Sequence, residues 1–339
     1  MAKNVKLADI AGKLGVSVVT VSKALSGQKG VSEEMREKII KLADELGYVQ
    51  PSVARQRAQS VSYQLGVLIQ EGYLGGYSSF YWQMHQKVAQ NAVERGCFSM
   101  LEVVTAQMEK QGMLPKLLTE NKADGIIIIG PLDERYLGKV LREVQVPVIF
   151  MDYMDKKQRL DCVISDSFYG GYYVTNHLIS MGHREIAYVG TLGATGSITD
   201  RYLGYAKALI EHGLEFRDEW VIDDRDRFGG AIDEEKKLKL PKNMPTAFFC
   251  NCDLCAGMLI RKLEKAGFKV PADVSVVGFD DFIYPGLCDI ELTSYAVDTE
   301  EMAKITVGSL ISKIDGSSYR KGIQVVEGRL MIRESVKRI

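Results

Sequence analysis

The 339-residue sequence lacks the segments that mark membrane and secreted proteins. No apolar run reaches the roughly 18 residues that a membrane span needs. The N-terminus, MAKNVKLADIAGKLG, has no apolar stretch like that of a secretory signal. Six scattered cysteines are few for so long a chain, and an intracellular protein keeps them reduced. We therefore expect a cytoplasmic protein that does not contact a membrane.

The motifs of common enzymes are also missing. There is no P-loop, no GxSxG elbow and no paired-carboxylate motif, and the chain has only four histidines. The loop GTLGATG (190–196) follows an apolar run, but its spacing is GxxGxxG, whereas dinucleotide folds need GxGxxG. An enzymatic activity would therefore rest on the fold alone, and a fold does not define a function. We expect no enzyme and no cofactor.

A metal site has weak support from one stretch, CNCDLC, which places Cys250, Cys252 and Cys255 close together. Thiolates bind zinc and iron–sulfur clusters, but such a site needs a fourth ligand, and no CxxC or HxxxH partner motif is present. Cys250 ends an apolar run and Cys255 falls in the helix that follows, where small apolar side chains pack well. We expect these thiols to pack and not to bind a metal.

The residues that are present describe a globular protein with an uneven charge. Hydrophobic residues make up 46% of the chain and charged residues 26%, and the length suggests two or three folding units. The net charge is −1, yet residues 1–60 hold ten Lys and Arg against six Asp and Glu, and the remainder holds 33 against 38. A small basic head on a mildly acidic body fits a head that meets a polyanion.

The first sixty residues carry signals for three short helices. Apolar residues recur at helical spacing from Leu7 to Leu14, Ser17 is a natural N-cap for a second helix, and Ser32 can cap a third. Glycine-bearing turns at 15, 26–27 and 47 end them. The polar segment from Pro51 then reads as a linker. The expected small core consists of Ile10, Leu14, Val21, Leu25, Ile39 and Leu46.

The second of these helices, within VSVVTVSKALSG (16–27), is typical of a DNA reader. Two helices joined by a glycine turn form a helix-turn-helix, whose second helix enters the major groove. Thr20 and Ser22 can donate to phosphate oxygens, and Lys23 can reach a phosphate or guanine. An ordinary three-helix cap that does not bind DNA is the alternative.

From residue 64 onward, apolar runs alternate with amphipathic stretches. The runs span 65–69, 98–104, 124–130, 146–152, 161–165, 185–190, 246–250, 274–279, 292–297 and 323–328, and the amphipathic stretches span 80–95, 107–121, 134–143, 169–181, 200–212, 253–266 and 299–314. This pattern predicts parallel sheets covered on both faces, and the number of strands predicts two α/β subdomains. Ligands of such sheets bind beyond the carboxyl ends of the strands.

The stretch LADIAGKLGVSVVTVSKALSGQKGVSEEMREKIIKLADELGY resembles the headpiece of LacI/GalR-type bacterial transcription regulators. The resemblance continues through DGIIII, GHREIAYVG, RYLGYAKAL and VPADVSVVGFDD, so it covers nearly the whole chain. It implies an α + α/β fold, in which a helix-turn-helix head precedes a type I periplasmic-binding-protein-like core of two doubly wound parallel-sheet subdomains. The expected division is a head at 1–50, a hinge linker at 51–62, an N-subdomain at 63–161 plus 295–322 and a C-subdomain at 162–294 plus 323–339.

The resemblance also implies a set of DNA contacts, which comprises Ser17, Val18, Val19, Thr20, Ser22, Lys23, Ala54, Arg55 and Arg57. Val18 and Val19 fall where the family places its base-reading side chains; they can pack on thymine methyl groups or merely fill space against sugar edges. In the hinge, Arg57 stands where the family has a leucine that wedges into the minor groove. An arginine fits a narrow minor groove but cannot wedge base pairs apart, and a solvated linker charge is the alternative.

The effector site implied by the resemblance comprises Phe80, Tyr81, Gly130, Asp152, Ser197, Arg201, Phe228, Cys252 and Asp280. Arg201 precedes a helix, and its planar fork suits paired hydroxyls or a carboxylate. A structural ion pair is the alternative for Arg201, and a helix cap or an interdomain salt bridge is the alternative for Asp280. The neighbouring aromatic residue Trp82 fits a position in the hydrophobic core as well as it fits one in the pocket. Cys252 departs from the family, because an asparagine usually stands at its position.

These features predict a ligand-responsive transcriptional regulator, in the first place a repressor, that binds a pseudo-palindromic operator as a homodimer, with a tetramer left open. Aromatic faces beside Arg and Asp favour a sugar as the effector, and a purine remains an alternative. The competing hypothesis is a small-molecule-binding or enzymatic α/β protein whose helical N-terminus does not bind DNA. Whether the effector releases or promotes DNA binding does not follow from the sequence.

Overall fold

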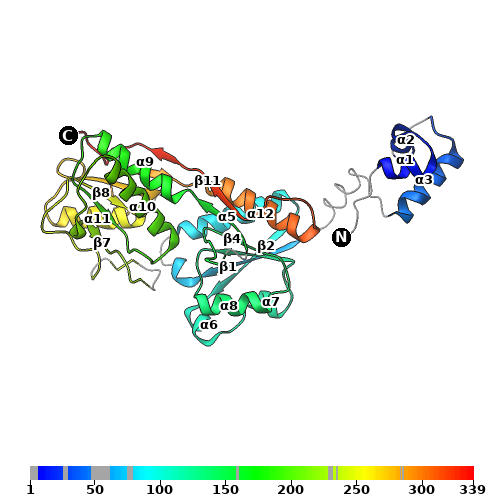
Figure 1. The fold of residues 1–339 in the computed structure, drawn as a ribbon. Helices are drawn as coiled ribbons and strands as arrows, with labels where there is room; N and C mark the ends of the chain where they lie inside the picture. Colours follow the sequence, from blue (N-terminus) through cyan, green and yellow to red (C-terminus); the bar gives the residue numbers. More distant parts are fainter. Residues whose placement is uncertain are drawn as a thin grey trace. The chain divides into compact units, whose positions relative to one another are not determined.

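The computed structural model describes residues 7–25, 30–46, 62–74, 79–157, 160–227, 232–233, 236–282, 284 and 286–339. The chain divides into two compact units, Met1–Ser62 and Tyr63–Ile339 (Figure 1). Among the described helices, none is both long and apolar enough to cross a membrane.

The N-terminal unit contains three helices, α1 (Leu7–Leu14), α2 (Val18–Leu25) and α3 (Glu33–Glu45). Its centre is formed by Ile10, Val21 and Ile39, which are fully buried, together with the small side chains Ala11, Ala24 and Ala43. The other predicted core residues, Leu14, Leu25 and Leu46, pack around this centre and are partly buried.

Polar contacts fix where α2 begins and how it meets α3. The backbone N–H of Thr20 donates to Ser17 Oγ at 3.0 Å, so Ser17 is the N-cap that the sequence predicts. Arg36 of α3 donates to the carbonyl oxygen of Ala24 at 3.0 Å, which satisfies an acceptor in the last turn of α2. The second helix is therefore held rigidly at both ends.

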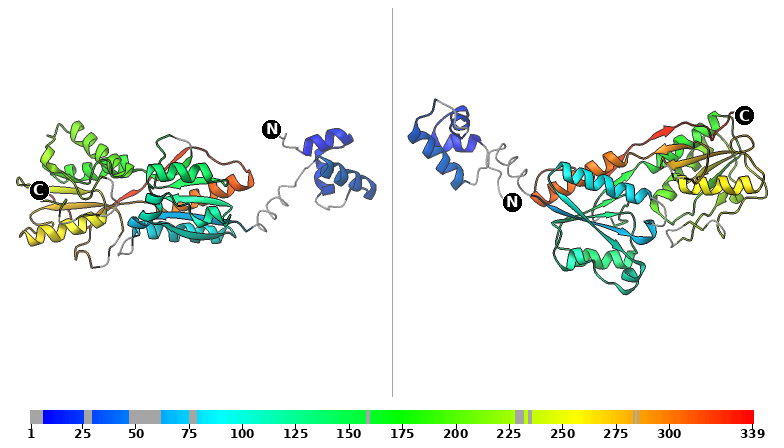
Figure 2. Two further views of the ribbon diagram at one scale, coloured as in Figure 1. Left: turned by 90° about the horizontal axis from the view of Figure 1, so that it is seen from below. Right: turned by 180° about the vertical axis from the view of Figure 1, so that it is seen from behind.

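Sheet A organises the first half of the C-terminal unit, with strand order β11-β5-β4-β3-β1-β2 and every neighbouring pair parallel. Its strands are β1 (Gln64–Gln70), β2 (Phe98–Val104), β3 (Gly125–Ile129), β4 (Val148–Met151), β5 (Asp161–Ser165) and β11 (Ile323–Val326). Helices α5 (Phe80–Glu94) and α12 (Thr299–Asp315) pack on one face. Helices α7 (Lys116–Thr119) and α8 (Glu134–Glu143) cover the other, with α6 (Ala106–Gln111) beside them (Figure 2).

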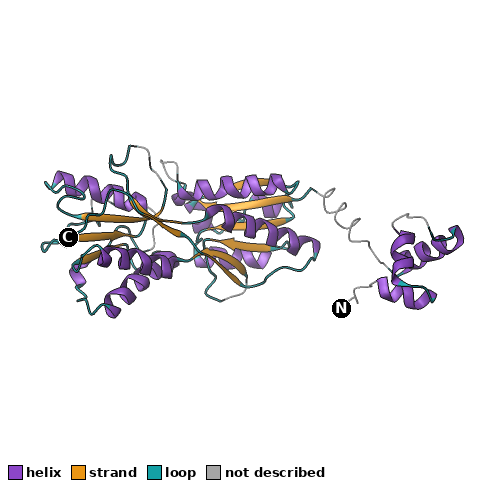
Figure 3. Ribbon diagram, turned by 90° about the horizontal axis from the view of Figure 1, so that it is seen from above, coloured by secondary structure: helices purple, strands orange, loops and turns teal. Residues whose placement is uncertain are grey.

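Sheet B organises the second half, with strand order β12-β10-β9-β8-β6-β7. Its strands are β6 (Ile186–Val189), β7 (Val221–Ile222), β8 (Ala247–Cys250), β9 (Ser275–Asp280), β10 (Thr293–Ala296) and β12 (Arg329–Met331), of which β12 is antiparallel to β10. Helices α9 (Ser167–Ser180) and α10 (Gly196–Glu211) cover one face, and α11 (Asp253–Lys265) covers the other. Figure 3 shows helices on both sides of the strands. Two short 3₁₀ helices, η1 (Glu71–Tyr73) and η2 (Asp218–Trp220), follow β1 and precede β7.

The crossings between the two sheets differ from the predicted subdomain boundaries. Strands β5 and β11 pair with each other in sheet A, although the sequence placed 162–165 and 323–326 in the second subdomain. Strand β10 pairs with β9 in sheet B, although 295–296 was placed in the first. The chain therefore crosses after Ser165, Ala296 and Val326, because a hydrogen-bonded ladder keeps each strand whole and an apolar run does not reveal its neighbours.

Two helices also differ from expectation. The stretch predicted as one helix over 107–121 forms α6 and α7, because Gly112 ends α6 in a left-handed conformation and Pro115 follows. Helix α10 begins at Gly196, capped by Thr195, so Arg201 lies inside the helix and does not precede it. The short strands β7 and β12 were not expected.

Candidate effector pocket and DNA-contacting helix

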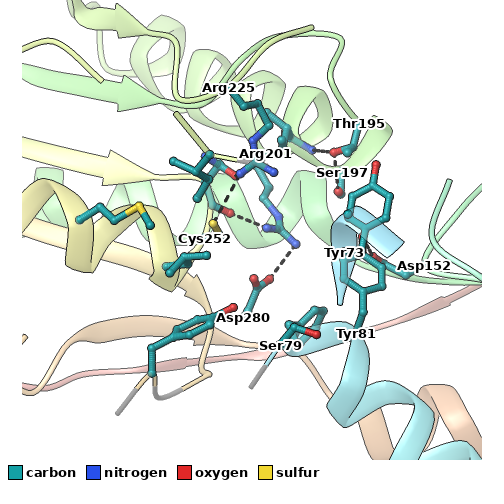
Figure 4. A pocket seen from close by; sticks show the side chains of 18 residues that line it. Tyr73, Ser79, Tyr81, Asp152, Thr195, Ser197, Arg201, Arg225, Cys252 and Asp280 are labelled. Atoms are coloured by element: carbon teal, nitrogen blue, oxygen red, sulfur yellow. Dashed lines mark hydrogen bonds and ion pairs between the residues drawn. The ribbon is translucent and has the colours of Figure 1, made fainter. Parts of the chain in front are cut away.

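A cavity of about 270 Å³ lies between sheets A and B, beyond the carboxyl ends of their strands (Figure 4). The sheet A half contributes Gly72, Tyr73, Ser79, Phe80, Tyr81 and Asp152 to its lining. The sheet B half contributes Thr195, Ser197, Ile198, Arg201, Arg225, Ile232, Asn251, Cys252, Leu254, Met258, Asp280 and Tyr284. The first half thus supplies mainly aromatic rings, and the second supplies most of the charged and hydrogen-bonding groups.

The cavity gathers most of the predicted effector residues, namely Phe80, Tyr81, Asp152, Ser197, Arg201, Cys252 and Asp280. Gly130 is not part of the lining. Its φ is 73°, and a Cβ at this position would lie 2.6 Å from Tyr81 Cε1. The absence of a side chain at Gly130 therefore leaves the space that the Tyr81 ring occupies. Phe228 lies outside the described residues. Trp82 is 41% exposed, so the core position considered for it is wrong.

The centre of the cavity is an ion pair between Arg201 and Asp280. Arg201 Nη2 lies 3.0 Å from Asp280 Oδ1, and the two side chains are 5% and 9% exposed. The guanidinium also donates to the carbonyl oxygen of Asn251 and lies 3.8 Å above the ring of Phe279. The structural ion pair considered for Arg201 is therefore present, and it lies within the sheet B half and not between the subdomains.

The pair still has unused hydrogen-bonding capacity. Within the described residues, the buried Arg201 Nε has no hydrogen-bond partner, and Asp280 Oδ1 is engaged only by the ion pair with Arg201 Nη2. Asp280 also adopts a φ of 100°, a conformation that a side chain other than glycine rarely takes. A buried donor without a partner is unfavourable unless a ligand completes it.

Asp152 brings a second carboxylate to the cavity from the end of β4. Tyr81 Oη donates to Asp152 Oδ2 at 3.1 Å, and Asp152 has a φ of 56°. Burial raises the pKa of Asp152 to about 6, although the charge of Arg201 opposes this. Burial likewise raises the pKa of Asp280 to about 7; Arg201 opposes the rise and Asp152 adds to it.

A buried network behind the cavity holds a second arginine that the sequence did not indicate. Arg225 donates to Asp224 Oδ2 from Nε at 3.0 Å and from Nη2 at 2.7 Å. Asp224 also accepts from the backbone of Thr191 at 3.0 Å and from Asn251 Nδ2 at 2.8 Å. The fully buried Asp224 therefore neutralises Arg225 at the cavity wall.

In the cysteine-rich stretch at the end of β8, two cysteines pack in the core and one lines the cavity. Cys250 and Cys255 are fully buried in the apolar core beside α11, as expected for packing. Cys252 lines the cavity, with Sγ 3.8 Å from Arg225 Nη2. In the described part of the chain, no cluster of three metal-binding side chains occurs.

Asp253 supports the cavity from outside its lining. Its carboxylate accepts from Ser294 Oγ at 2.7 Å and from the backbone N–H of Phe282 at 2.8 Å. These bonds fix the chain just after Asp280, so Asp253 positions the cavity carboxylate without lining the cavity itself.

Sequence reasoning missed Tyr73, Arg225 and Asn251 as lining residues. Each follows the end of a strand, after β1, β7 and β8 respectively, which is the signal that could have identified them. Strand β7 has only two residues, so its end was not visible as an apolar run.

The predicted DNA contacts of the head lie along α2 and at its N-cap. Val18 is 45% exposed and Val19 is 62% exposed, while Val21 and Ala24 of the same helix are buried. Ser17, Ser22 and Lys23 are exposed as well, and Thr20 Oγ1 lies 2.8 Å from Ser17 Oγ. Two exposed valines beside hydroxyls and a lysine form a surface able to contact both base methyl groups and phosphates. Ala54, Arg55 and Arg57 lie outside the described residues.

Comparison with known proteins identifies both units. Residues 6–51 match bacterial regulatory proteins of the lacI family, and residues 175–336 match a periplasmic binding protein-like domain. The HTH-type transcriptional repressor PurR of Photobacterium profundum is 26% identical over 330 residues, which cover 97% of this chain and 98% of that protein. The ribose operon repressor of Haemophilus influenzae is 25% identical over 328 residues, which cover 97% of each.

A solved structure of the transcriptional regulator CelR in complex with cellobiose has the same fold, with a TM-score of 0.68 at 24% identity over 98% of this chain and 99% of that one. The relatives named here are transcriptional regulators and repressors, and none is an enzyme. The chain therefore combines a DNA-binding domain of the lacI family of bacterial regulatory proteins with a periplasmic binding protein-like domain, and transcriptional repressors align with it from end to end.

Proposed function

We propose that this protein is a repressor whose affinity for operator DNA is set by an uncharged sugar bound between sheets A and B. The observation that carries the proposal is the buried Arg201–Asp280 pair, in which Arg201 Nε lacks a hydrogen-bond partner among the described residues. Adjacent hydroxyls of a sugar can accept from the arginine and donate to the carboxylate.

The charges of the cavity favour a ligand without a phosphate or carboxylate. Arg201 is paired with Asp280, and Arg225 is paired with Asp224. Asp152 adds a further carboxyl group to the lining. An anionic ligand would face the carboxyl groups of Asp152 and Asp280, while the guanidinium groups of Arg201 and Arg225 are already paired, and we expect such a ligand to be excluded. The relatives that support a sugar are the regulator solved in complex with cellobiose and the repressor of a ribose operon.

On DNA, we infer a homodimer that places two α2 helices in successive major grooves, with half-sites about one helical turn apart. Val18 and Val19 contact thymine methyl groups, and Ser17, Thr20, Ser22 and Lys23 contact the backbone or a guanine. In the linker, Ala54 and Arg55 contact DNA and Arg57 enters a narrow minor groove.

The effector acts by changing how the two halves of the core are held. The residues that line its cavity come from both halves. Binding therefore favours one arrangement of the three chain crossings after Ser165, Ala296 and Val326. The effector shifts operator affinity only as far as it binds the two arrangements differently.

A thermal-shift screen of the full-length chain tests the ligand class. The probes are D-ribose, D-xylose, D-glucose and cellobiose, with glucose 6-phosphate, glucuronate, hypoxanthine and guanine as comparisons. A true ligand at 100 times its Kd stabilises the folded chain by about 2.7 kcal/mol. We expect a shift with a neutral sugar and none with the anionic ones. A shift with a purine base alone would replace the sugar in this proposal, and no shift with any probe would contradict it.

A further inference from the structure

We propose that Tyr73 determines the specificity of the cavity for a closed sugar ring, by offering its aromatic face to the apolar C–H face of that ring. This inference rests on the proposed sugar effector. It assigns a role to the segment after β1, which neither the sequence motifs nor the family resemblance had indicated.

The position of Tyr73 fits such a wall. Its ring lines the cavity and lies 4.9 Å from the ring of Tyr81, tilted by 43°. In Figure 4 both rings and Asp152 lie on one side of the cavity, with Arg201 and Asp280 facing them. A sugar between these walls has its hydroxyl edge toward the ion pair and one ring face toward Tyr73, which is the arrangement that aromatic stacking needs.

The short helix η1 is anchored from outside the cavity. Glu71 Oε1 accepts from the backbone N–H of Ala106 at 2.7 Å, and Gln70 Oε1 accepts from that of Gly72 at 2.6 Å. Gln70 also donates to Glu109 at 3.4 Å. The polar side chains of Gln70 and Glu71 are thus bonded within the protein, and Tyr73 is the side chain of η1 that lines the cavity.

Tyr73 also begins a series of ring contacts that links the two halves of the core. Tyr81 meets Phe80 at 6.0 Å, Phe80 meets Phe282 at 6.4 Å, and Phe282 meets Tyr284 at 4.6 Å. Phe80 begins α5 beside sheet A, whereas Phe282 follows β9 of sheet B. Both end members, Tyr73 and Tyr284, line the cavity. A ring held against Tyr73 is therefore in contact with the series that spans the cleft.

Calorimetric titration of the full-length chain tests this role. The probes are D-ribose, D-xylose and D-glucose, each paired with its open-chain alditol, and cellobiose, paired with cellobiitol, in which only the reducing ring is opened. For a sugar that binds, we expect the alditol to bind at least about 10-fold more weakly to the wild type, a difference of about 1.4 kcal/mol. Tyr73→Ala should weaken the closed sugar by about that factor and bring the ratio toward one. Tyr73→Phe, which keeps the ring, should retain both affinity and ratio.

Tyr169→Ala, which removes a half-exposed tyrosine of α9, is the matched control and should leave both values unchanged. If Tyr73→Ala keeps the wild-type preference for the closed ring, or weakens sugar and alditol equally, the role of Tyr73 is overturned while the sugar effector stands. If the wild type binds none of the sugars, the proposed sugar effector itself fails, and this inference fails with it.

Discussion

Arg201 Nη2 and Asp280 Oδ1 lie 3.0 Å apart inside the cavity, and each side chain is less than a tenth exposed. A buried pair of this kind is costly to desolvate and contributes little stability by itself. Neighbouring groups hold the pair in a fixed orientation. Phe279 lies under the Arg201 guanidinium, the carbonyl oxygen of Asn251 accepts a hydrogen bond from that guanidinium, and Asp253 fixes the chain that follows Asp280. The pair is thus an oriented donor and acceptor that a hydroxylated ligand can use without rearrangement.

Replacing Arg201 by alanine should weaken effector binding by about 10- to 100-fold, because hydrogen bonds to charged groups contribute about 1.5–3 kcal/mol each. Operator binding without effector should stay close to the wild-type value, since the head keeps its own core. Arg135→Ala, at an exposed position of α8, is the control and should change neither. Calorimetry and anisotropy with labelled operator measure the two affinities, and a parallel loss of both would count against the effector role of Arg201.

The raised pKa values of Asp280 and Asp152, to about 7 and about 6, predict a pH-dependent stability. The folded chain keeps protons on these carboxyls at pH values where the unfolded chain, with a pKa of 3.8, has lost them. The free energy of unfolding therefore falls as pH rises from about 4 to about 7 and levels off above.

Urea unfolding between pH 4.5 and 8 measures this effect. Asp280→Asn removes the group with the higher pKa, so the decline of its unfolding free energy should end nearer pH 6. If wild type and variant lose stability with the same slope throughout, these carboxyls do not titrate as described.

Gly130→Ala should destabilise the core by about 1–3 kcal/mol, because it forces a side chain into the left-handed region. The new Cβ would also displace Tyr81 and break its hydrogen bond to Asp152, so effector binding should weaken as well. Gly308→Ala in α12 is the control, since a Cβ there meets no atom within 4 Å. That change should stabilise the helix by up to about 1 kcal/mol. Thermal unfolding compares the two, and equal effects would refute the tight contact at Gly130.

Val19→Ala should lower affinity for the selected operator by about 10-fold, because a lost base contact costs on the order of 1–3 kcal/mol. Affinity for random DNA should not change. Lys23→Ala should instead weaken binding to both and reduce the salt dependence by about one counterion. Anisotropy titrations over a range of salt concentrations distinguish the two. A Val19→Ala chain that keeps its operator preference would show that the valine only fills space.

The elements of the fold follow closely from the sequence wherever an apolar run has clear ends. The strands at 98–104 and 161–165 and the helix at 134–143 lie where the pattern predicts them. The pairing of β5 with β11 could not be predicted, because these strands are some 160 residues apart and hydrophobicity does not encode neighbours. The subdomain boundaries were misplaced for the same reason.

The residues that line the cavity could be predicted where they match a family motif, and could not be predicted where the chain departs from such a motif. Arg201 and Asp280 were expected from such motifs, and they do meet. Arg225 was not expected, because its environment depends on Asp224, Thr191 and Asn251, which three different strands bring together. Tyr73 lies in a glycine-rich segment whose sequence has no helical or strand period, so only its place after β1 marks it.

One titration tests directly whether a ligand in this cavity changes the affinity of the head for DNA. Operator selected from random DNA is titrated with the full-length chain, with and without the sugar found in the thermal-shift screen, and with the Arg201→Ala chain in parallel. We predict that the sugar changes the operator Kd by a factor of about 5 to 150 for the wild type, and much less for the variant at the same concentration. An operator Kd that the bound sugar leaves unchanged in the wild type would contradict the account.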